Sequence, residues 1–525
     1  MKKQKVLFWH KLFLFGVLLF INTQLFAQIK GKVTDSDGMP LPGVTVLEKN
    51  TQNGVITDIN GQYQLKLKNA PEAVLVFSFV GLTTKEILVE GKTVINVVLE
   101  DDSRKLEEVV VVAYGTQKKV SVTGAISSVS TKDLKQSPSA NFIGTLAGRL
   151  PGLVTVQTGG KPGEEGINMY LRGVSTTNGT EPLVLVDGVP RDIITNIDPN
   201  EVESVSVLKD ASATAVFGVR GANGVILITT KRGSNRTPQL SVSAEYGIQN
   251  VTRIPKPLDS WEFATLRRQA FKNDGLPIPA GFSDAAIAKY KSGVDPVMYP
   301  NTNWFEMLIK PNAPMNRYNV NVSGGNDRVK YFMNGSYTHQ GSTYKSESKE
   351  KLGYDPAFKM DRYNFRTNLD IKMNSWIKST FNLGGYIESV NESQFTNTNT
   401  FSPIVAMYSH TPLTPGPTTL AGYGVPVDEV ITTSSNPNTA FGGMNRSGYS
   451  NETRSNLNST LAFNFDLDWI TKGLSSKAMV SFDSKSNAII DGTKNYTRFN
   501  FQLVQEADPN DPTQLIDKVT FTPKT

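Results

Sequence analysis

The sequence predicts a multidomain protein of the all-β and α+β classes, with a small N-terminal β-sandwich, a mixed α/β domain and part of an antiparallel transmembrane β-barrel. Three patterns predict it: frequent turn signals between short β-rich runs near the start, alternating helix and strand patterns up to about residue 235, and long apolar–polar alternation beyond. With 525 residues the chain has room for three or more domains. Its charged content of 19% and hydrophobic content of 38% lie below the usual averages of about 25% and 45%, which suits a large β structure with polar turns.

Residues 1–27 are predicted to be a secretory signal peptide. Several lysines precede an apolar run from Leu12 to Ile21, and Ala27 marks the expected cleavage position. The run is too short for a membrane-spanning helix of about 20 residues. No later stretch reaches about 18 consecutive apolar residues, so the mature chain is expected to leave the cytoplasm without a spanning helix.

The composition argues against catalytic and metal-dependent chemistry. The sequence has no cysteine, which rules out disulfides, thiolate zinc sites, iron–sulfur clusters and cysteine nucleophiles. Beyond the leader only His339 and His410 remain, and turn residues follow both, so each is interpreted as a loop or strand-end side chain. The net charge is +6, but the basic residues are dispersed, which argues against nucleic-acid binding. We therefore expect no catalytic residue, no cofactor-binding residue and no metal ligand.

The β-sandwich is predicted over residues 28–101. In "YQLKL", Tyr63, Leu65 and Leu67 share one face, which is the alternation of a half-buried strand. Seven such runs, separated by turns, are typical of a sandwich. The runs are "IKGKV", "GVTVLE", "VITDI", "YQLKL", "AVLVFSFV", "TKEILV" and "TVINVVL".

Two local patterns resemble ligand sites but fit turns better. The segment "DSDGMPLPGV" has acidic residues, yet its glycine stands at the wrong offset for a calcium loop and no closing glutamate follows. The segment "TGGKPGEEG" is not a phosphate loop, because Lys161 precedes proline rather than serine or threonine. The glycines at 218, 221 and 224 are interpreted as turn and packing residues.

The mixed α/β domain is predicted over residues 120–235. Helices are expected in "SANFIGTLAGRL", at Pro199 behind the capping residue Asp198, and from Asp210 to a stop at Gly218. The strands are "LVTVQT", "INMYLRG", "PLVLVDGVP", the run after Pro199, and a buried strand in "GVILITTKRG".

Residues 236–525 carry the pattern of a membrane barrel with long external loops. In "RYNFRTNLDIKM", Tyr363, Phe365 and Leu369 alternate with Asn364 and Arg366, and aromatic residues gather near strand ends. The links between strands alternate between short and long, as in outer-membrane barrels, and helices are expected in the first long link. Eight strands are predicted, near 240–249, 316–324, 328–339, 361–373, 376–388, 456–469, 474–486 and 494–504.

The segment "KLEEVVVVAYG" lies in a predicted linker, residues 102–119, between the sandwich and the mixed domain. Four consecutive valines favour an extended strand, and polar residues flank them. An exposed strand of this kind invites pairing with another chain. The alternative is that it forms the last strand of the sandwich.

Two long stretches resemble known families. "GKVTDSDGMPLPGVTV…GVITDINGQYQL" resembles the carboxypeptidase regulatory-like domain, a non-catalytic module. "LRGVSTTNGTEPLVLVDGVP…IDPNEVESVSVLKDASATAVFGVRGANGVILITTKRG" resembles the plug domain of TonB-dependent outer-membrane transporters, in the SusC/RagA branch. The residues that match the plug motif are Arg172, Gly173, Asp187, Gly188, Lys209, Asp210, Gly218, Arg220, Gly221 and Gly224.

The resemblance implies roles for particular residues. A plug sits inside a barrel, so Arg172 and Arg220 are expected to meet acidic groups on the barrel wall; the alternative is ordinary packing and surface arginines. The valine segment resembles a TonB box, the stretch that pairs with TonB by adding a strand. Its core consists of Glu108, Val109, Val110, Val111 and Val112.

The end of the sequence departs from the family pattern. The family barrel has about twice as many strands and ends on an aromatic residue, whereas this chain ends at Thr525. A barrel of about eight strands has no room for a plug. We therefore expect a fragment, or missing strands supplied by another chain.

The resemblance implies import rather than catalysis. We expect a protein of the cell outer membrane that imports a bulky polar substrate, an oligosaccharide or oligopeptide, with the sandwich and TonB box in the periplasm. The implied partners are TonB with ExbB and ExbD, a SusD-like surface lipoprotein and outer-membrane lipid. The alternative is a surface receptor, adhesin or signalling receptor that does not transport; an enzyme is not expected.

Overall fold

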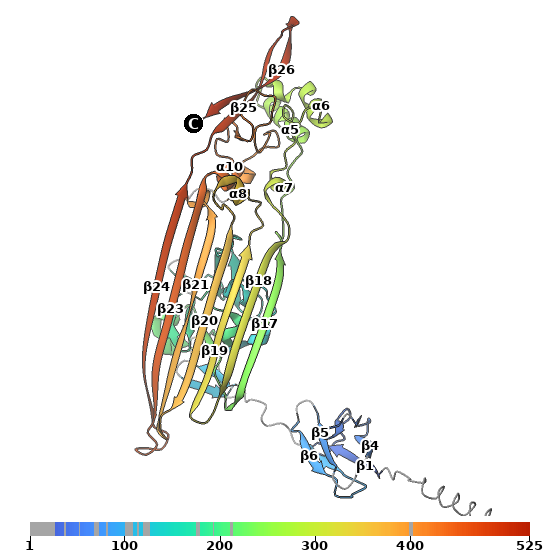
Figure 1. Ribbon diagram of the computed structural model, residues 1–525, viewed down its shortest axis with the longest axis vertical. Helices are drawn as coiled ribbons and strands as arrows, with labels where there is room; N and C mark the ends of the chain where they lie inside the picture. Colours follow the sequence, from blue (N-terminus) through green and yellow to red (C-terminus); the bar gives the residue numbers. More distant parts are fainter. Residues whose placement is uncertain are drawn as a thin grey trace, which may run out of the picture. The chain divides into compact units, whose positions relative to one another are not determined.

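The chain divides into two compact units, of which one holds the N-terminal sandwich and the other holds the mixed domain and the long strands. Figure 1 shows the computed structural model. The predicted signal peptide lies outside the described residues except for Ala27. The structure describes residues 27–35, 38–51, 53–67, 73–79, 82–99, 109–112, 115–118, 126–174, 179–192, 194–210, 214–397 and 403–524.

The first unit is a sandwich of two sheets, as predicted. One sheet has the order β4-β1-β7 and the other the order β3-β2-β5-β6. Alternating residues of β4 are buried, among them Tyr63, Leu65 and Leu67, and they join one hydrophobic core with Leu75 and Phe77. The strands are β1 (Ala27–Thr34), β2 (Thr45–Glu48), β3 (Gly54–Ile56), β4 (Gln62–Leu67), β5 (Val74–Ser78), β6 (Lys85–Leu88) and β7 (Val97–Val98).

The valine run forms strand β8 (Val109–Val112), and it has a partner within its own chain. It pairs with β9 (Gly115–Lys118) in a separate sheet of two strands. It therefore joins neither sheet of the sandwich, and among the described residues it is not the unpaired strand that the sequence suggested. A sheet of two strands is only marginally stable by itself.

The plug domain is built on a five-stranded sheet with the order β10-β15-β16-β13-β14 and a separate hairpin, β11–β12. One face of the sheet and the hairpin share a core that includes Phe142, Leu146, Val205 and Ile226. The elements are β10 (Ile126–Ser130), α2 (Thr131–Leu134), α3 (Phe142–Leu146), β11 (Leu153–Gln157), β12 (Ile167–Leu171), β13 (Leu183–Val186), β14 (Val189–Pro190), η2 (Pro199–Glu201), β15 (Val202–Leu208), η3 (Ala215–Gly221) and β16 (Val225–Thr230).

The helical segments of the plug are shorter than the sequence indicated. Asn141, rather than Ser139 at the start of the predicted helix, caps α3 by accepting a hydrogen bond from the backbone N–H of Ile143. Asp198 caps η2 as predicted, because its carboxylate accepts from the N–H of Asn200 at 2.7 Å. The predicted helix after Asp210 appears as a 3₁₀ segment, η3, that Gly218 interrupts.

Seven long antiparallel strands form a single sheet, and the plug domain lies against one of its faces (Figure 1). Along β20 the polar residues are buried against the plug, with Arg362 at 3% and Asn368 at 1% exposure, while Tyr363 is 57% exposed on the outer face. Apolar residues outside and polar residues inside are the arrangement of a membrane barrel. The strands are β17 (Arg236–Gln249), β18 (Ala313–Gly325), β19 (Val329–Gly341), β20 (Lys359–Lys372), β21 (Ile377–Ser393), β23 (Gly448–Asp466) and β24 (Ser475–Thr493).

The prediction of an eighth barrel strand near 494–504 is wrong. That segment belongs to β25 (Arg498–Asp508), which pairs with β22 (Val430–Thr432) and β26 (Asp511–Lys524) in a sheet of its own. The reason is the length of β24, which continues to Thr493 instead of ending near residue 486. Because β24 runs on to the loop end, β25 begins beyond that end of the sheet rather than returning along it. Within the described residues, β17 and β24 are the two edges of the seven-stranded sheet.

The connections between the long strands gather at opposite ends of the sheet (Figure 1). We call the end with tight turns the turn end and the end with long links the loop end. Two helices were predicted in the first long link, and both are present, as α5 and α6. No helix in the described ranges is long and apolar enough to cross a membrane. The loop-end helices are α5 (Ser260–Asn273), η4 (Ala280–Phe282), α6 (Asp284–Ser292), α7 (Trp304–Leu308), α8 (Lys349–Leu352), η5 (Gln394–Asn397), α9 (Pro403–Tyr408) and α10 (Ala440–Arg446).

Candidate functional site

The candidate site is the surface on which the plug contacts the barrel wall, together with the cavities beside it. One plug-motif pair, Asp187 and Gly188, forms the tight turn between β13 and β14. Both residues have positive φ angles, 51° and 85°, as a two-residue type I′ hairpin requires. The Asp187 carboxylate accepts from the backbone N–H of Thr230 at 3.0 Å and from its hydroxyl at 2.6 Å. The turn is thereby tied to the end of β16.

The two motif arginines do not meet the barrel wall. Arg172 forms an ion pair with Asp210 at 2.7 Å, so its partner is another motif residue of the plug. Arg220 is exposed, and no acidic side chain of the described barrel strands pairs with it. Within the seven described strands neither arginine meets an acidic group of the wall, and the role of the two arginines stays a prediction.

The other motif residues hold the plug together internally. Lys209 donates to the Ser127 hydroxyl at 2.7 Å, which links β15 to the neighbouring strand β10. Gly224 has a φ of 86°, and a Cβ atom there would lie 2.6 Å from Leu171 Cδ1. Gly173, Gly218 and Gly221 lie at turns or kinks around the same elements.

A buried ion pair crosses from the plug to the wall. Glu201, in η2, accepts from Arg366 Nε of β20 at 2.7 Å, and both side chains are at least nine-tenths buried. Burial raises the pKa of Glu201 to about 7, while the guanidinium of Arg366 opposes that rise. Breaking one partner of such a pair leaves an uncompensated buried charge, which is costly. This contact therefore fixes the plug to the wall.

Wall arginines also hold backbone oxygens of the plug next to α3. Arg362 donates to the carbonyl of Ala140 at 2.5 Å and to the Asn196 side chain at 3.0 Å. Arg317, on β18, donates to the carbonyl of Ser139 at 2.7 Å. Hydrogen bonds from charged donors are about twice as strong as neutral ones. The α3 end of the plug is thus fixed from two separate strands.

The link between β11 and β12 contacts the wall near the loop end. Lys161 pairs with Glu392 of β21 at 2.6 Å, and Glu164 pairs with Arg454 of β23 at 2.7 Å. Although burial works against it, the carboxylates of Glu164 and Glu392 raise the pKa of Lys161. The charge of this lysine is therefore well compensated.

A further set of contacts lies near the turn end. Arg232, just after β16, pairs with Asp370 of β20 at 2.7 Å. Asn368 donates to the carbonyl of Lys231 at 2.7 Å. The plug is therefore fixed to the wall near both ends of the sheet, through β21 and β23 at the loop end and through β20 at the turn end.

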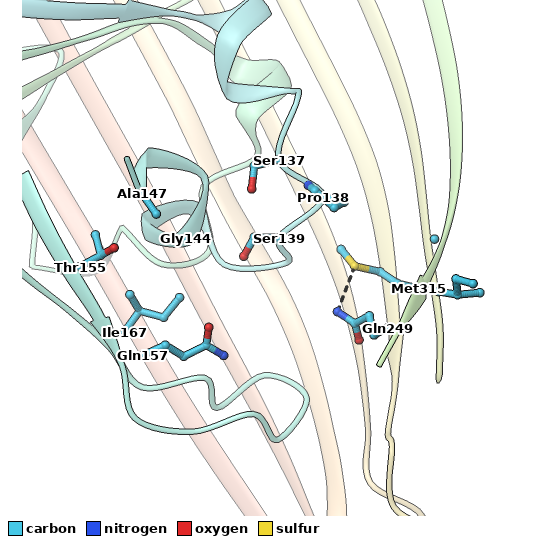
Figure 2. A pocket seen from close by; sticks show the side chains of 12 residues that line it. Ser137, Pro138, Ser139, Gly144, Ala147, Thr155, Gln157, Ile167, Gln249 and Met315 are labelled. Atoms are coloured by element: carbon cyan, nitrogen blue, oxygen red, sulfur yellow. Dashed lines mark hydrogen bonds between the residues drawn. The ribbon is translucent and has the colours of Figure 1, made fainter. Parts of the chain in front are cut away.

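A cavity of about 520 Å³ opens between the plug and the loop-end parts of β17 and β18. Figure 2 shows Ser137, Ser139 and Gln157 of the plug on one side and Gln249 on the other. No charged side chain is among its described lining residues. The cavity can accept a ligand through neutral hydroxyl and amide groups.

The sequence also singled out the valine run and His410. Glu108 lies outside the described residues, and the structure gives only the backbone of Val109–Val112. The TonB-box assignment therefore stays a prediction. His410 is buried among the loop-end elements, stacked on Trp304 with ring centroids 4.1 Å apart, and accepts from the N–H of Ala440. Burial lowers the pKa of His410 to about 4, so it is a neutral packing residue.

Sequence reasoning did not identify the residues that join plug and wall. Glu201 stands in "DPNEVESV", where an acid in the first helical turn has an ordinary explanation. Its partner Arg366 is 165 positions away along the chain. The only available signal was the charge on the inward side of the predicted barrel strands.

Comparisons with known proteins agree with this architecture. The CarboxypepD_reg-like domain family matches residues 29–111, and the TonB-dependent Receptor Plug Domain family matches residues 118–225. The first match covers the sandwich and most of the valine run, and the second covers the plug up to the start of β16.

Curated relatives match over a larger part of the chain. The TonB-dependent receptor P26 of Formosa agariphila is 35% identical over 382 residues, which are 71% of this chain and 36% of the relative. The TonB-dependent receptor SusC of Bacteroides thetaiotaomicron is 30% identical over 380 residues, 68% of this chain and 36% of the relative. The chain spans about a third of the length of the curated relatives it matches.

Solved structures show the same fold. A structure of the RagAB peptide transporter aligns with a TM-score of 0.52 at 22% identity, over 70% of this chain and 42% of that one. The RagAB peptide importer in the 'open-open' state aligns with a TM-score of 0.52 at 23% identity, over 77% and 44%.

Proposed function

Because the chain is an outer-membrane protein of the SusC/RagA type among TonB-dependent receptors, we propose that it serves the energised import of a bulky polar nutrient across that membrane. The substrate is an oligosaccharide or an oligopeptide. The loop end of the sheet then faces the outside and the turn end the periplasm, because outer-membrane barrels place short turns inside.

The observation that carries the proposal is the way the plug is fixed to the wall. Charged and amide side chains of several strands contact the plug along its length, and the central pair of Glu201 and Arg366 is buried. Such a plug obstructs the pore until work is done on it. The outer membrane has no ATP supply, so the work has to come from a partner that reaches across the periplasm.

The valine run is the proposed attachment point for that partner. A strand with an extended backbone can pair with an edge strand of TonB, so that main-chain hydrogen bonds carry the pull. ExbB and ExbD supply the energy to TonB. In this proposal the pairing of β8 with β9 is a resting state that TonB replaces, which is feasible because a sheet of two strands is only marginally stable.

A SusD-like lipoprotein is the proposed partner on the outer side. The loop end carries substantial folded structure with its own hydrophobic clusters, around Trp304 and around Tyr290 and Tyr299. Such ordered links offer a firm surface for a lid. The neutral cavity shown in Figure 2 is the place where a polar substrate first meets the plug.

The proposal is tested by uptake of a radiolabelled substrate in cells that make this protein, with and without ExbB. Substrates are chosen from oligosaccharide and oligopeptide mixtures that support growth. Uptake is expected to stop without ExbB, while binding to the cell surface continues. Uptake that ignores the loss of ExbB contradicts the import function, and binding without any uptake points to a receptor.

A further inference from the structure

A second cavity, of about 710 Å³, lies at the loop end, apart from the plug. We call it the loop-end cavity. It is lined by the end of β24, the link to β25, α10 and η5. These elements come from the connection between β21 and β23, from the segment that follows β24, and from the strands β25 and β26. Several independent parts of the chain therefore enclose this space.

Three basic side chains, those of Lys494, Arg498 and Lys524, line the loop-end cavity, and no acidic side chain is among its lining residues. None of the three has a carboxylate partner in the described part of the chain, although ion pairs are frequent elsewhere at the loop end. Lys494 and Arg498 are the two that aromatic rings position. The charge at this position is thus left free for a ligand.

An aromatic ring lies beside each of these two cations and holds it in position. Lys494 Nζ lies 5.5 Å from the ring centre of Tyr354, and Arg498 Cζ lies 5.7 Å from that of Tyr496. Arg498 also donates to Asn438 Oδ1 at 3.0 Å. A cation resting on a ring keeps its other donors available. Both charges are therefore held in place without being neutralised.

Two polar atoms of the cavity lining are buried and have no hydrogen-bond partner in the described part of the chain. One is a donor, Nε of Arg498, and the other is an acceptor, Oε1 of Gln394. Unpaired buried polar atoms are rare and costly, and they commonly mark a place that a ligand or ion occupies. A ligand that satisfies both atoms has an anionic or acceptor group and also a hydroxyl or amide donor.

From this set we propose that the loop-end cavity binds the acidic substituent of a charged oligosaccharide, a carboxylate or a sulfate, which is the cargo of the import function proposed above. Lys494 and Arg498 bind the anionic group. Gln394 accepts a hydrogen bond from a sugar hydroxyl, and the partly buried rings of Phe395 and Tyr496 in the lining supply apolar surface against which the sugar packs. This inference rests on the proposed function and narrows its substrate class.

The test is equilibrium binding to the purified full chain in detergent, measured by titration calorimetry. The probes are a galacturonic acid hexamer, its fully methyl-esterified form and a κ-carrageenan hexasaccharide, which carries sulfate groups and no carboxylate. The two acidic probes are expected to bind about tenfold more tightly than the neutral ester, because charge-assisted hydrogen bonds are lost with the charge. Their relative affinities distinguish a carboxylate from a sulfate site. The advantage is expected to shrink with added salt.

Substitutions connect the binding to the cavity. K494Q and R498Q are each expected to weaken binding of the acidic probe about tenfold and to leave the ester unaffected. R498K, which keeps the charge, retains most of the binding and shows that loss is not misfolding. The matched control is K518Q, because Lys518 lies on β26 and pairs with Glu506 at 2.8 Å.

Two outcomes overturn the inference: equal affinity for the acid and its ester, or unchanged binding in both K494Q and R498Q. Tighter binding of a hexaglutamate peptide than of either acidic saccharide overturns the choice of a sugar. Binding needs no TonB, so a failure here leaves the uptake experiment unaffected. A failure of uptake likewise leaves the binding result standing.

Discussion

At the scale of single residues, the pair of Glu201 and Arg366 is the contact on which the position of the plug depends most. E201Q leaves the Arg366 guanidinium buried without a charge partner, and is expected to lower the free energy of unfolding by about 3–5 kcal/mol. The measurement is urea unfolding of the full chain in detergent at pH 8, where Glu201 is ionised.

The same strand supplies a matched control. Glu203 lies two positions along on β15 and is exposed, so E203Q is expected to change stability by less than about 0.5 kcal/mol. The double variant E201Q/R366Q removes both charges and is expected to be more stable than E201Q alone. Two results contradict the role of this buried ion pair. One is an equal loss of unfolding free energy in E201Q and E203Q, and the other is a loss in the double variant that equals the sum of the two single losses.

At the scale of elements, the plug depends on a close approach between β12 and the turn before β16. G224A places a Cβ atom 2.6 Å from Leu171 Cδ1, at a backbone φ of 86°. The left-handed backbone and the overpacking together are expected to cost about 2–4 kcal/mol in unfolding free energy. Thermal and urea unfolding of the full chain measure it.

Gly335 is the control for this prediction. It lies within β19, and a Cβ atom built there meets nothing within 4 Å. G335A is therefore expected to leave stability within about 0.5 kcal/mol of the wild type. If G224A is tolerated as well as G335A, the tight packing of β12 against that turn is not a constraint on the plug.

Elements were predictable from the sequence wherever a local rule determines them. Alternation of side chains is visible within one strand, so β4 and β20 could be placed, and the positive φ angles of Asp187 and Gly188 follow from turn chemistry. The end of β24 was placed too early, near residue 486, although the turn residues of "DGTKN" stand at its actual end, and the error moved β25 into the barrel.

The partners of charged residues were also beyond the sequence. The plug motif suggested that Arg172 contacts the wall, yet the nearest carboxylate in the fold belongs to Asp210 of the plug itself. The wall instead supplies arginines, and the plug supplies Glu201 and backbone oxygens. Such pairings depend on which strands become neighbours, and local patterns in the sequence do not reveal them.

At the scale of the whole molecule, the structure separates three tasks. The loop end has ordered helices and a cationic cavity, the plug is held against the wall by charged contacts, and the valine run lies before the plug in the chain. Ligand binding at the loop end and pulling on the valine run can be linked only through the contacts between plug and wall. Coupling therefore requires that force on the valine run reaches the contacts between plug and wall.

Coupling through the valine run depends on the backbone of β8. V110P removes one backbone donor from β8 and disfavours strand pairing, so import is expected to fall to the level seen without ExbB while surface binding of substrate is unchanged. V110I keeps an extended, β-branched residue and is expected to import normally. Radiolabelled uptake and surface binding are measured in the same cells.

A second proline separates the two possible partners of the valine run. Q117P disrupts β9, the partner within the chain, and leaves Val109–Val112 intact. If TonB pairs with the valine run, Q117P retains import, because the resting hairpin only competes with TonB. If Q117P abolishes import as fully as V110P does, the hairpin itself is the functional element, and the valine run does not act as the strand that TonB binds.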